Sequence, residues 1–152
     1  MAKSDVNKEL IEKIYLMLQP YPEAAAFVIA YRDYIHDIDD IIDEGAKRSS
    51  ENILRVFARA SALFTMPFWQ MYGRQLLLVE QTINNTFTDS VEWEKSDVPW
   101  KINDSNVLRH CGIDMFYAVI LLILGRDALR TISSDFRRQA HLLHTNEEGL
   151  PV

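Results

Sequence analysis

Apolar residues recur every three to four positions along most of this chain, the spacing that places side chains on one side of an α-helix. The clearest stripe lies between Glu23 and Gly45 and consists of Phe27, Tyr31, Ile35, Ile38 and Ile42. No stretch alternates apolar and polar residues for more than a few positions, as a half-buried strand would. The pattern therefore predicts an all-α protein.

Capping residues and helix breakers divide this pattern into about five predicted helices. Ser4 or Asp5 caps a first helix that runs to about Gln19, where the Pro-Tyr-Pro sequence at 20–22 ends it. The second helix starts near Glu23 and stops at Gly45, because glycine suits the left-handed position after a helix.

The middle of the chain contains two further predicted helices. Ser49 or Ser50, followed by an acidic residue, starts a third helix that is interrupted near Pro67. A fourth helix continues from there to about Phe87. Residues 88–104 break the periodicity with mixed polar residues, so we expect the longest loop there.

The last predicted element is a helical region that reaches about His144, with a kink near Gly125 and a polar tail over 145–152. Its cap is one of Asn103, Asp104 and Ser105. The 152 residues, 48% hydrophobic and 25% charged, suit one globular domain over 1–152. We predict a single compact antiparallel bundle of about five helices.

Net charge and cysteine content limit the classes of partner and the cellular locations that we expect. The net charge of -6 argues against a nucleic-acid partner, since binding to phosphates needs a positive surface. Cys111 is the only cysteine and is expected in the core, and the charged N-terminal segment does not resemble a signal peptide. The apolar run from Met115 to Leu124 is too short to span a membrane. These features favour a cytoplasmic protein with no membrane span.

The stretch "YIHDIDDIIDEG", residues 34–45, concentrates acidic residues on a predicted helix. At helical spacing these residues divide into two groups. One acidic face consists of Asp33, Asp37, Asp40 and Glu44, whereas Asp39 and Asp43 lie beside His36 at the edge of the isoleucine stripe. Carboxylates one turn apart at such an edge suit Mg²⁺, which prefers oxygen ligands.

The sequence from Asp39 to Asp43 resembles the DDxxD motif of class I terpenoid and prenyl-diphosphate synthases. Asn84, Thr88 and Glu92, spaced four residues apart, are similar to the second metal motif of the terpene cyclases. The resemblance implies Mg²⁺ as a cofactor, held against a substrate diphosphate by Asp39, Asp43, Asp40, His36 and this triad. It is confined to these motifs, because the chain is shorter and the motifs lie closer together than in those synthases.

Two alternatives to this resemblance remain for the acidic stretch. The residues from Asp40 to Asp43 and from Glu94 to Asp97 are also similar to the paired acidic motifs of the all-α nucleotide pyrophosphatases. The interpretation that we favour is a solvated acidic helix face, since DDxxD arises readily in acidic helices.

A basic stripe lies on the last predicted helix, at Arg126, Arg130, Arg137, His141 and His144. Its guanidinium groups are candidates for binding a phosphate-containing cofactor, or for pairing with the acidic helix of the same chain or of a second subunit. The ordinary interpretation is a solvated face with scattered salt bridges.

Two functional hypotheses follow from the sequence. The favoured one is a non-enzymatic helical module that acts as a homo-oligomer or binds a protein partner, using apolar residues near Met66–Tyr72 or the final helix. The alternative is Mg²⁺-dependent binding or turnover of an isoprenoid or nucleotide diphosphate ligand at the acidic helix.

Overall fold

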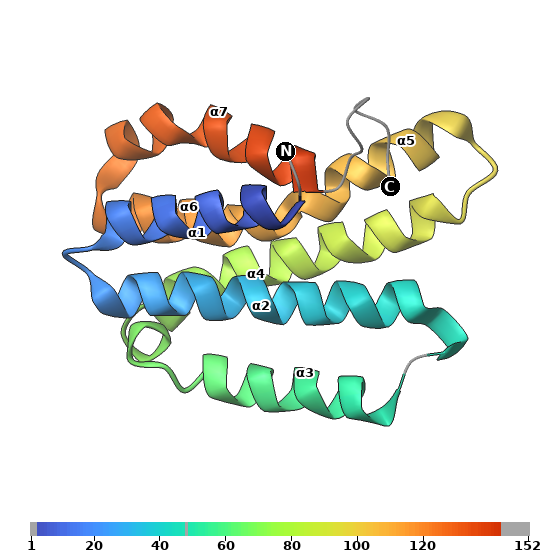
Figure 1. Cartoon of the computed structure of the whole chain (residues 1–152), viewed down its shortest axis with the longest axis horizontal. Coiled ribbons are helices and arrows are strands. Elements are labelled where there is room, and N and C mark those ends of the chain that lie inside the picture. The colour runs from blue at the N-terminus through green and yellow to red at the C-terminus, as the bar shows by residue number, and fades with distance from the viewer. Residues whose placement is uncertain (1–2, 48, 144–152) are drawn as a thin grey trace.

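The protein is described by a computed structural model, which gives the backbone of residues 3–47 and 49–143 (Figure 1). Side chains are described for residues 8–45, 47 and 49–139. Within these ranges the chain forms seven α-helices and two 3₁₀ helices, and no strand. The predicted all-α class is confirmed.

Helices joined by a turn run in alternating directions across the molecule, whereas α5 and α6 run in the same direction (Figure 1). Helices α5, η2 and α6 follow one another without a gap, so the bundle has somewhat more helical segments than the five predicted. The elements are α1 (Lys3–Leu18), α2 (Pro22–Glu44), η1 (Gly45–Lys47), α3 (Ser50–Leu63), α4 (Pro67–Glu94), α5 (Pro99–Leu108), η2 (Arg109–Gly112), α6 (Ile113–Ile123) and α7 (Gly125–Leu143).

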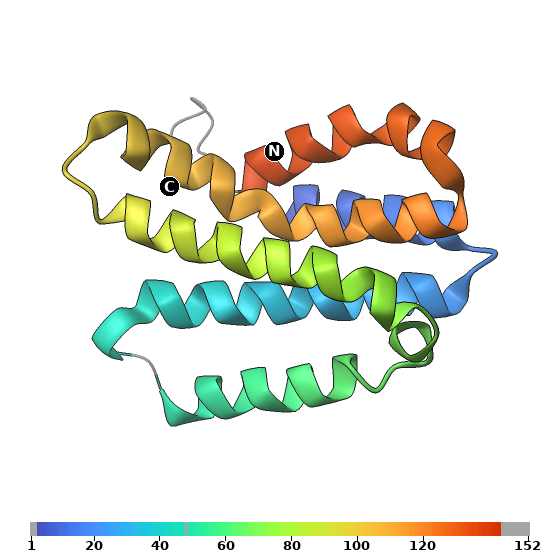
Figure 2. The ribbon, with the colours of Figure 1, turned by 180° about the vertical axis from the view of Figure 1, so that it is seen from behind.

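The core lies where α2, α4 and α6 meet, with α1 and α7 covering one side. Viewed from behind, α4 lies in front of α2, with the α5–α6 segment next to it (Figure 2). Each large apolar side chain buried here contributes about 1.5–3 kcal/mol to folding. Cys111 is buried as predicted. The most deeply buried side chains include Phe27, Leu76, Ile83, Met115, Val119 and Ile120.

Several predicted helix boundaries are confirmed by local geometry. The Ser49 hydroxyl accepts a hydrogen bond from the backbone N–H of Asn52 at 3.1 Å, which caps α3. Gly45 has a φ of 54°, a conformation that favours glycine, at the end of α2. Pro67 is the first residue of α4, where its missing N–H costs no helical hydrogen bond.

The predicted loop over 88–104 is wrong, because α4 continues to Glu94 and α5 begins at Pro99. Ser90 is fully buried, and its hydroxyl donates to the backbone carbonyl of Phe87 at 2.6 Å. Trp93 and Trp100 then pack edge to face across the short connection, with ring centroids 5.3 Å apart. Packing between α4 and α5 thus outweighs the weak helix propensity of these residues.

The final helical region is also divided differently from the prediction. Its start is Pro99 rather than residues 103–105, and near Gly125 the chain turns back sharply instead of kinking. Gly125, the first residue of α7, has a φ of 83° at the turn between α6 and α7, which pack against each other.

The helical segment Pro99–Ile123 is long and apolar enough, by length and composition alone, to cross a membrane. Its most apolar window has a mean hydropathy of 1.4, and 33% of that window is buried. Among the described residues it is the one segment that meets these limits. Core helices of water-soluble proteins meet them too, so this finding assigns no membrane role.

Candidate functional site

The first acidic face of α2 binds α3. The Arg55 side chain donates from Nε to Asp37 at 3.2 Å, and Arg59 forms a closer ion pair with the same carboxylate. Arg59 also reaches Asp33 at 3.3 Å. Asp37 is only 7% exposed as a result. The favoured prediction of a solvated face is therefore wrong for Asp37, because two arginines from α3 cover it, whereas Asp33 keeps 38% of its side chain exposed.

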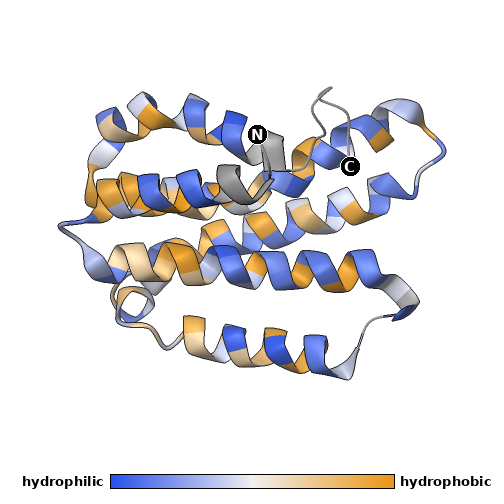
Figure 3. Cartoon of the chain, viewed as in Figure 1, coloured by the Kyte–Doolittle hydropathy of each residue, from blue (hydrophilic) through white to orange (hydrophobic). Residues whose placement is uncertain are grey.

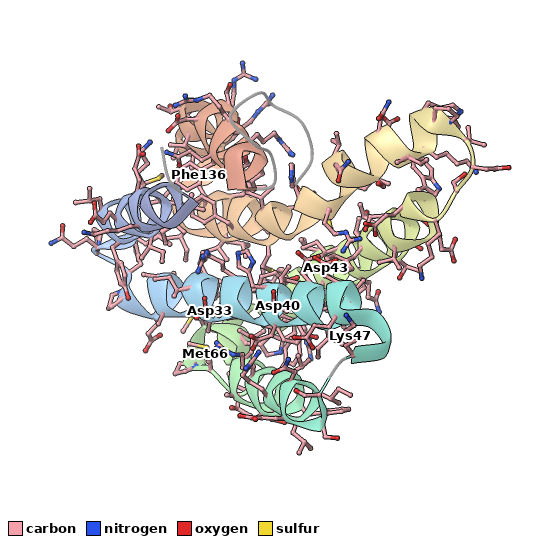
Figure 4. The ribbon with its side chains drawn as sticks, turned by 45° about the vertical axis from the view of Figure 1, so that its right-hand side comes forward. Asp33, Asp40, Asp43, Lys47, Met66 and Phe136 are labelled. Atoms are coloured by element: carbon pink, nitrogen blue, oxygen red, sulfur yellow. The ribbon has the colours of Figure 1, made fainter. Side chains whose placement is uncertain are left out.

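The same contact continues at the far end of α2. The Asn52 side-chain amide donates to both carboxylate oxygens of Glu44, at 2.8 and 2.9 Å. Asp40, between these contacts, remains exposed (Figure 4). This acidic face therefore holds α3 in place through polar contacts.

The second group of carboxylates on α2 surrounds Arg109 of η2. Its guanidinium donates to Asp39 at 2.7 Å and to Glu94 at 2.6 Å, and approaches Asp43 at 3.6 Å. It also lies 5.1 Å from the centroid of the Phe87 ring. The Arg109 side chain is only 10% exposed. The first and last aspartates of the DDxxD-like motif and Glu94 of the pyrophosphatase-like motif thus meet at an arginine.

Three carboxylates share this one guanidinium, so negative charge is in excess around it. Burial, and next the charge of Asp39, raise the pKa of Asp43 above its ordinary value. Arg109 offsets this effect only in part.

The predicted magnesium ligands do not form a preformed site. Asp39 is bound by Arg109, and among the described residues no group of three or more His, Cys, Asp and Glu side chains is arranged to hold a metal ion. Asn84 donates to Glu80 at 3.3 Å, the Thr88 hydroxyl donates to the Asn84 carbonyl, and Glu92 is exposed. The magnesium site remains a prediction, which requires an ion to displace Arg109 from Asp39.

An apolar cavity of about 100 Å³ opens beside this cluster. Side chains from α1, α2, α4, α6 and α7 line most of it, including Phe136 on α7 (Figure 4). Its polar residues include His36, Asp39 and Arg109. Burial lowers the pKa of His36, and the Arg32 guanidinium acts in the same direction. Two of the residues chosen from sequence, His36 and Asp39, thus lie at the polar side of a cavity.

Glu80 is a buried acid that sequence reasoning did not select. It is 5% exposed, accepts a hydrogen bond from the Tyr31 hydroxyl at 2.5 Å, and lies in the apolar stripe of α4 between Leu76 and Ile83. Burial raises the pKa of its carboxyl, against the opposing hydrogen bonds from Tyr31 and Asn84. A charged residue inside an apolar stripe was the available signal.

The predicted basic stripe lies on α7, away from the acidic helix. Arg137 pairs with Asp114 of α6 at 3.2 Å and lies over the Tyr117 ring, at 5.0 Å from its centroid. Arg126 and Arg130 are exposed on the same helix. The side chains of His141 and His144 lie outside the described residues. The described arginines match the scattered salt bridges of the ordinary interpretation.

The outer side of α3 exposes apolar residues. Leu54 is 66% exposed and Phe57 is 67% exposed, while Ile53 and Val56 beside them are half-buried. Hydrophobic and hydrophilic residues both occur along this helix (Figure 3). Only Leu63, at the C-terminal end, is buried. We call Ile53, Leu54, Val56 and Phe57 the α3 apolar face.

Comparison with known proteins does not identify this chain. No protein-family model, curated protein or solved structure matches it.

Proposed function

We propose that the protein is a self-association module in which two copies pair through the α3 apolar face. The observation that carries this proposal is the orientation of α3, whose polar side faces α2 and whose apolar side faces outward. Arginines bind the helix to α2, while large apolar side chains such as Leu54 and Phe57 face outward. Exposed apolar residues grouped on one helix are typical of protein–protein contact surfaces.

The chemistry of this face suits a second copy of the chain. In a two-fold interface, residues near the axis lie close to their own copies, so charged residues there would repel. From Ile53 to Ala62 the only charged side chains are Arg55 and Arg59. Both are bound to Asp37 of their own chain. The α3 apolar face therefore meets its copy without like-charge repulsion.

The expected affinity is modest. Burial of Leu54 and Phe57 from both copies supplies roughly 6–12 kcal/mol, at about 1.5–3 kcal/mol for each side chain. Association itself costs about 4–15 kcal/mol in lost freedom of movement. The difference allows a dissociation constant no tighter than about 1 μM.

Sedimentation velocity tests the proposal across protein concentrations from about 0.1 to 500 μM, which start below the tightest dissociation constant expected. We expect the native protein to shift from monomer to dimer. Leu54→Gln combined with Phe57→Gln should keep it monomeric, with unchanged circular dichroism, because both side chains are exposed in the monomer.

Leu16→Gln is the matched control, since Leu16 is 74% exposed on α1 and lies outside the α3 apolar face. It should leave the dimer intact. A native protein that stays monomeric throughout contradicts the proposal. So does a dimer that Leu16→Gln disrupts and the α3 double variant does not.

A further inference from the structure

The cavity beside Asp39 is separate from the α3 apolar face, so the proposed self-association does not use it. We propose that it binds a small uncharged alcohol, with a branched alkyl group among the apolar side chains and the hydroxyl group at the polar side. This class of ligand follows from the size of the cavity, its apolar lining and the pairing of its charged groups.

The size and lining of the cavity set the apolar part of the ligand. Its volume is about 100 Å³, and a cavity of roughly 150 Å³ binds benzene, so this one suits a smaller group. Its wall is closely packed where η2 meets α2, because a Cβ added at Gly112 would lie 3.2 Å from Ile35 Cγ2. A short branched alkyl group fits this space better than a long lipid chain or a large ring. The apolar lining includes Ile14, Val28, Ile35, Ile113, Met115 and Phe136.

The charged side chains in the lining are already paired within the protein. Arg109 donates to Asp39 at 2.7 Å, and both side chains line the cavity. Arg32, the other arginine of the lining, pairs with Asp33 at 2.9 Å. An ammonium or carboxylate head group would lose its hydration here and would have to compete for a counter-ion that is already bound. The cavity therefore favours an uncharged ligand.

Two histidines at the polar side match a hydroxyl group. His36 of α2 and His110 of η2 both line the cavity. Burial lowers the pKa of His36, so its imidazole is mostly uncharged at pH 7. An uncharged imidazole has one donor and one acceptor nitrogen, and a hydroxyl group likewise donates and accepts. A hydroxyl group can therefore form hydrogen bonds at this side without a counter-ion.

Three probes with the same branched carbon skeleton separate the contribution of the alkyl group from that of the head group. These are 3-methylbutanol, 3-methylbutylamine and 3-methylbutanoate, which carry a hydroxyl, an ammonium and a carboxylate group. Methyl NMR titrations at pH 7 would follow Ile14, Val28 and Met115, which line the cavity. We expect the alcohol to shift these signals and to bind about fivefold or more tightly than either ion.

Ile113→Phe tests whether the alcohol binds in the cavity, because the larger side chain fills part of the space. It should weaken binding of the alcohol by about tenfold or more. Ile35→Phe fills the cavity from α2 and serves the same purpose if Ile113→Phe does not fold. Ile102→Phe makes the same substitution at a position that is 39% exposed on α5 and outside the lining, and it should leave binding unchanged.

Three results would overturn the proposal. The first is that no probe shifts the cavity methyl groups of the folded protein. The second is that either ion binds as tightly as the alcohol, and the third is that a folded cavity-filling variant binds the alcohol as tightly as the native protein does. The α3 double variant should bind the alcohol normally, which separates these results from the test of self-association.

Discussion

Replacement of Arg109 by methionine removes the cation shared by Asp39, Asp43 and Glu94 but keeps an apolar side chain next to Phe87. We expect a large loss of stability at neutral pH, because three carboxylates then lie together without their common partner. The effect should be larger than that of removing an exposed arginine.

The size of this loss follows from the exposure of each partner. Removing one member of a buried ion pair costs about 3–5 kcal/mol. Arg109 and Asp39 approach that situation, with 10% and 17% of their side chains exposed. Asp43 and Glu94 are 65% and 52% exposed, and pairs of that kind are worth about 0–1 kcal/mol each. We therefore expect Arg109→Met to reduce the free energy of unfolding by about 2–4 kcal/mol.

Urea denaturation at pH 7 measures this loss, and Arg126→Met, on the exposed surface of α7, serves as the control with a change below about 0.5 kcal/mol. Acidification adds a second signature. Arg109 lowers the pKa of Asp43, so loss of Arg109 raises that pKa further above its ordinary value, and stability should return in part as pH falls from about 7 to about 4.5. A loss below about 1 kcal/mol, or one equal to that of Arg126→Met, would refute the assigned role of Arg109.

Three further predictions concern the other buried charges and the magnesium hypothesis. Burial raises the pKa of Glu80 above 4.5, so its contribution to stability should grow as pH falls from about 7. Melting curves of Glu80→Gln should lack this growth, and an unchanged pH dependence would contradict the assignment. Asp37→Ala should release α3 and accelerate hydrogen exchange in α3 by about 5- to 150-fold, corresponding to about 1–3 kcal/mol. Equal acceleration in α6 would show that the ion pairs do not act locally. The magnesium hypothesis requires that Mg²⁺ with diphosphate raise the melting temperature of the native protein. The increase should be larger in the Arg109→Met variant and absent in the variant that combines Asp39→Asn with Asp43→Asn. It fails if the shift is no larger than that at matched ionic strength.

The candidate site was only partly predictable from the sequence. Helical spacing placed His36 and Asp39 at the edge of an apolar stripe, and both line the cavity. The counter-ion Arg109 lies 70 positions away from Asp39 in the chain. Such a pair depends on how η2 packs against α4, which brings Arg109 next to α2 and which no local pattern encodes. The pairs on the opposite face of α2 were equally unpredictable from the sequence, because its carboxylates contact arginines that only the packing of α3 brings near.

By itself, the sequence determined the helical class and many of the helix boundaries. Helical hydrogen bonds and caps join residues a few positions apart, so Ser49, Gly45 and Pro67 act locally and were recognisable as boundaries. Tertiary structure alone decided the features that depend on distant neighbours. Packing extended α4 through Ser90 and Trp93 against their local propensity. It also buried Glu80 against Tyr31, and it turned the apolar face of α3 outward, because burial and charge pairing are set by which helices meet.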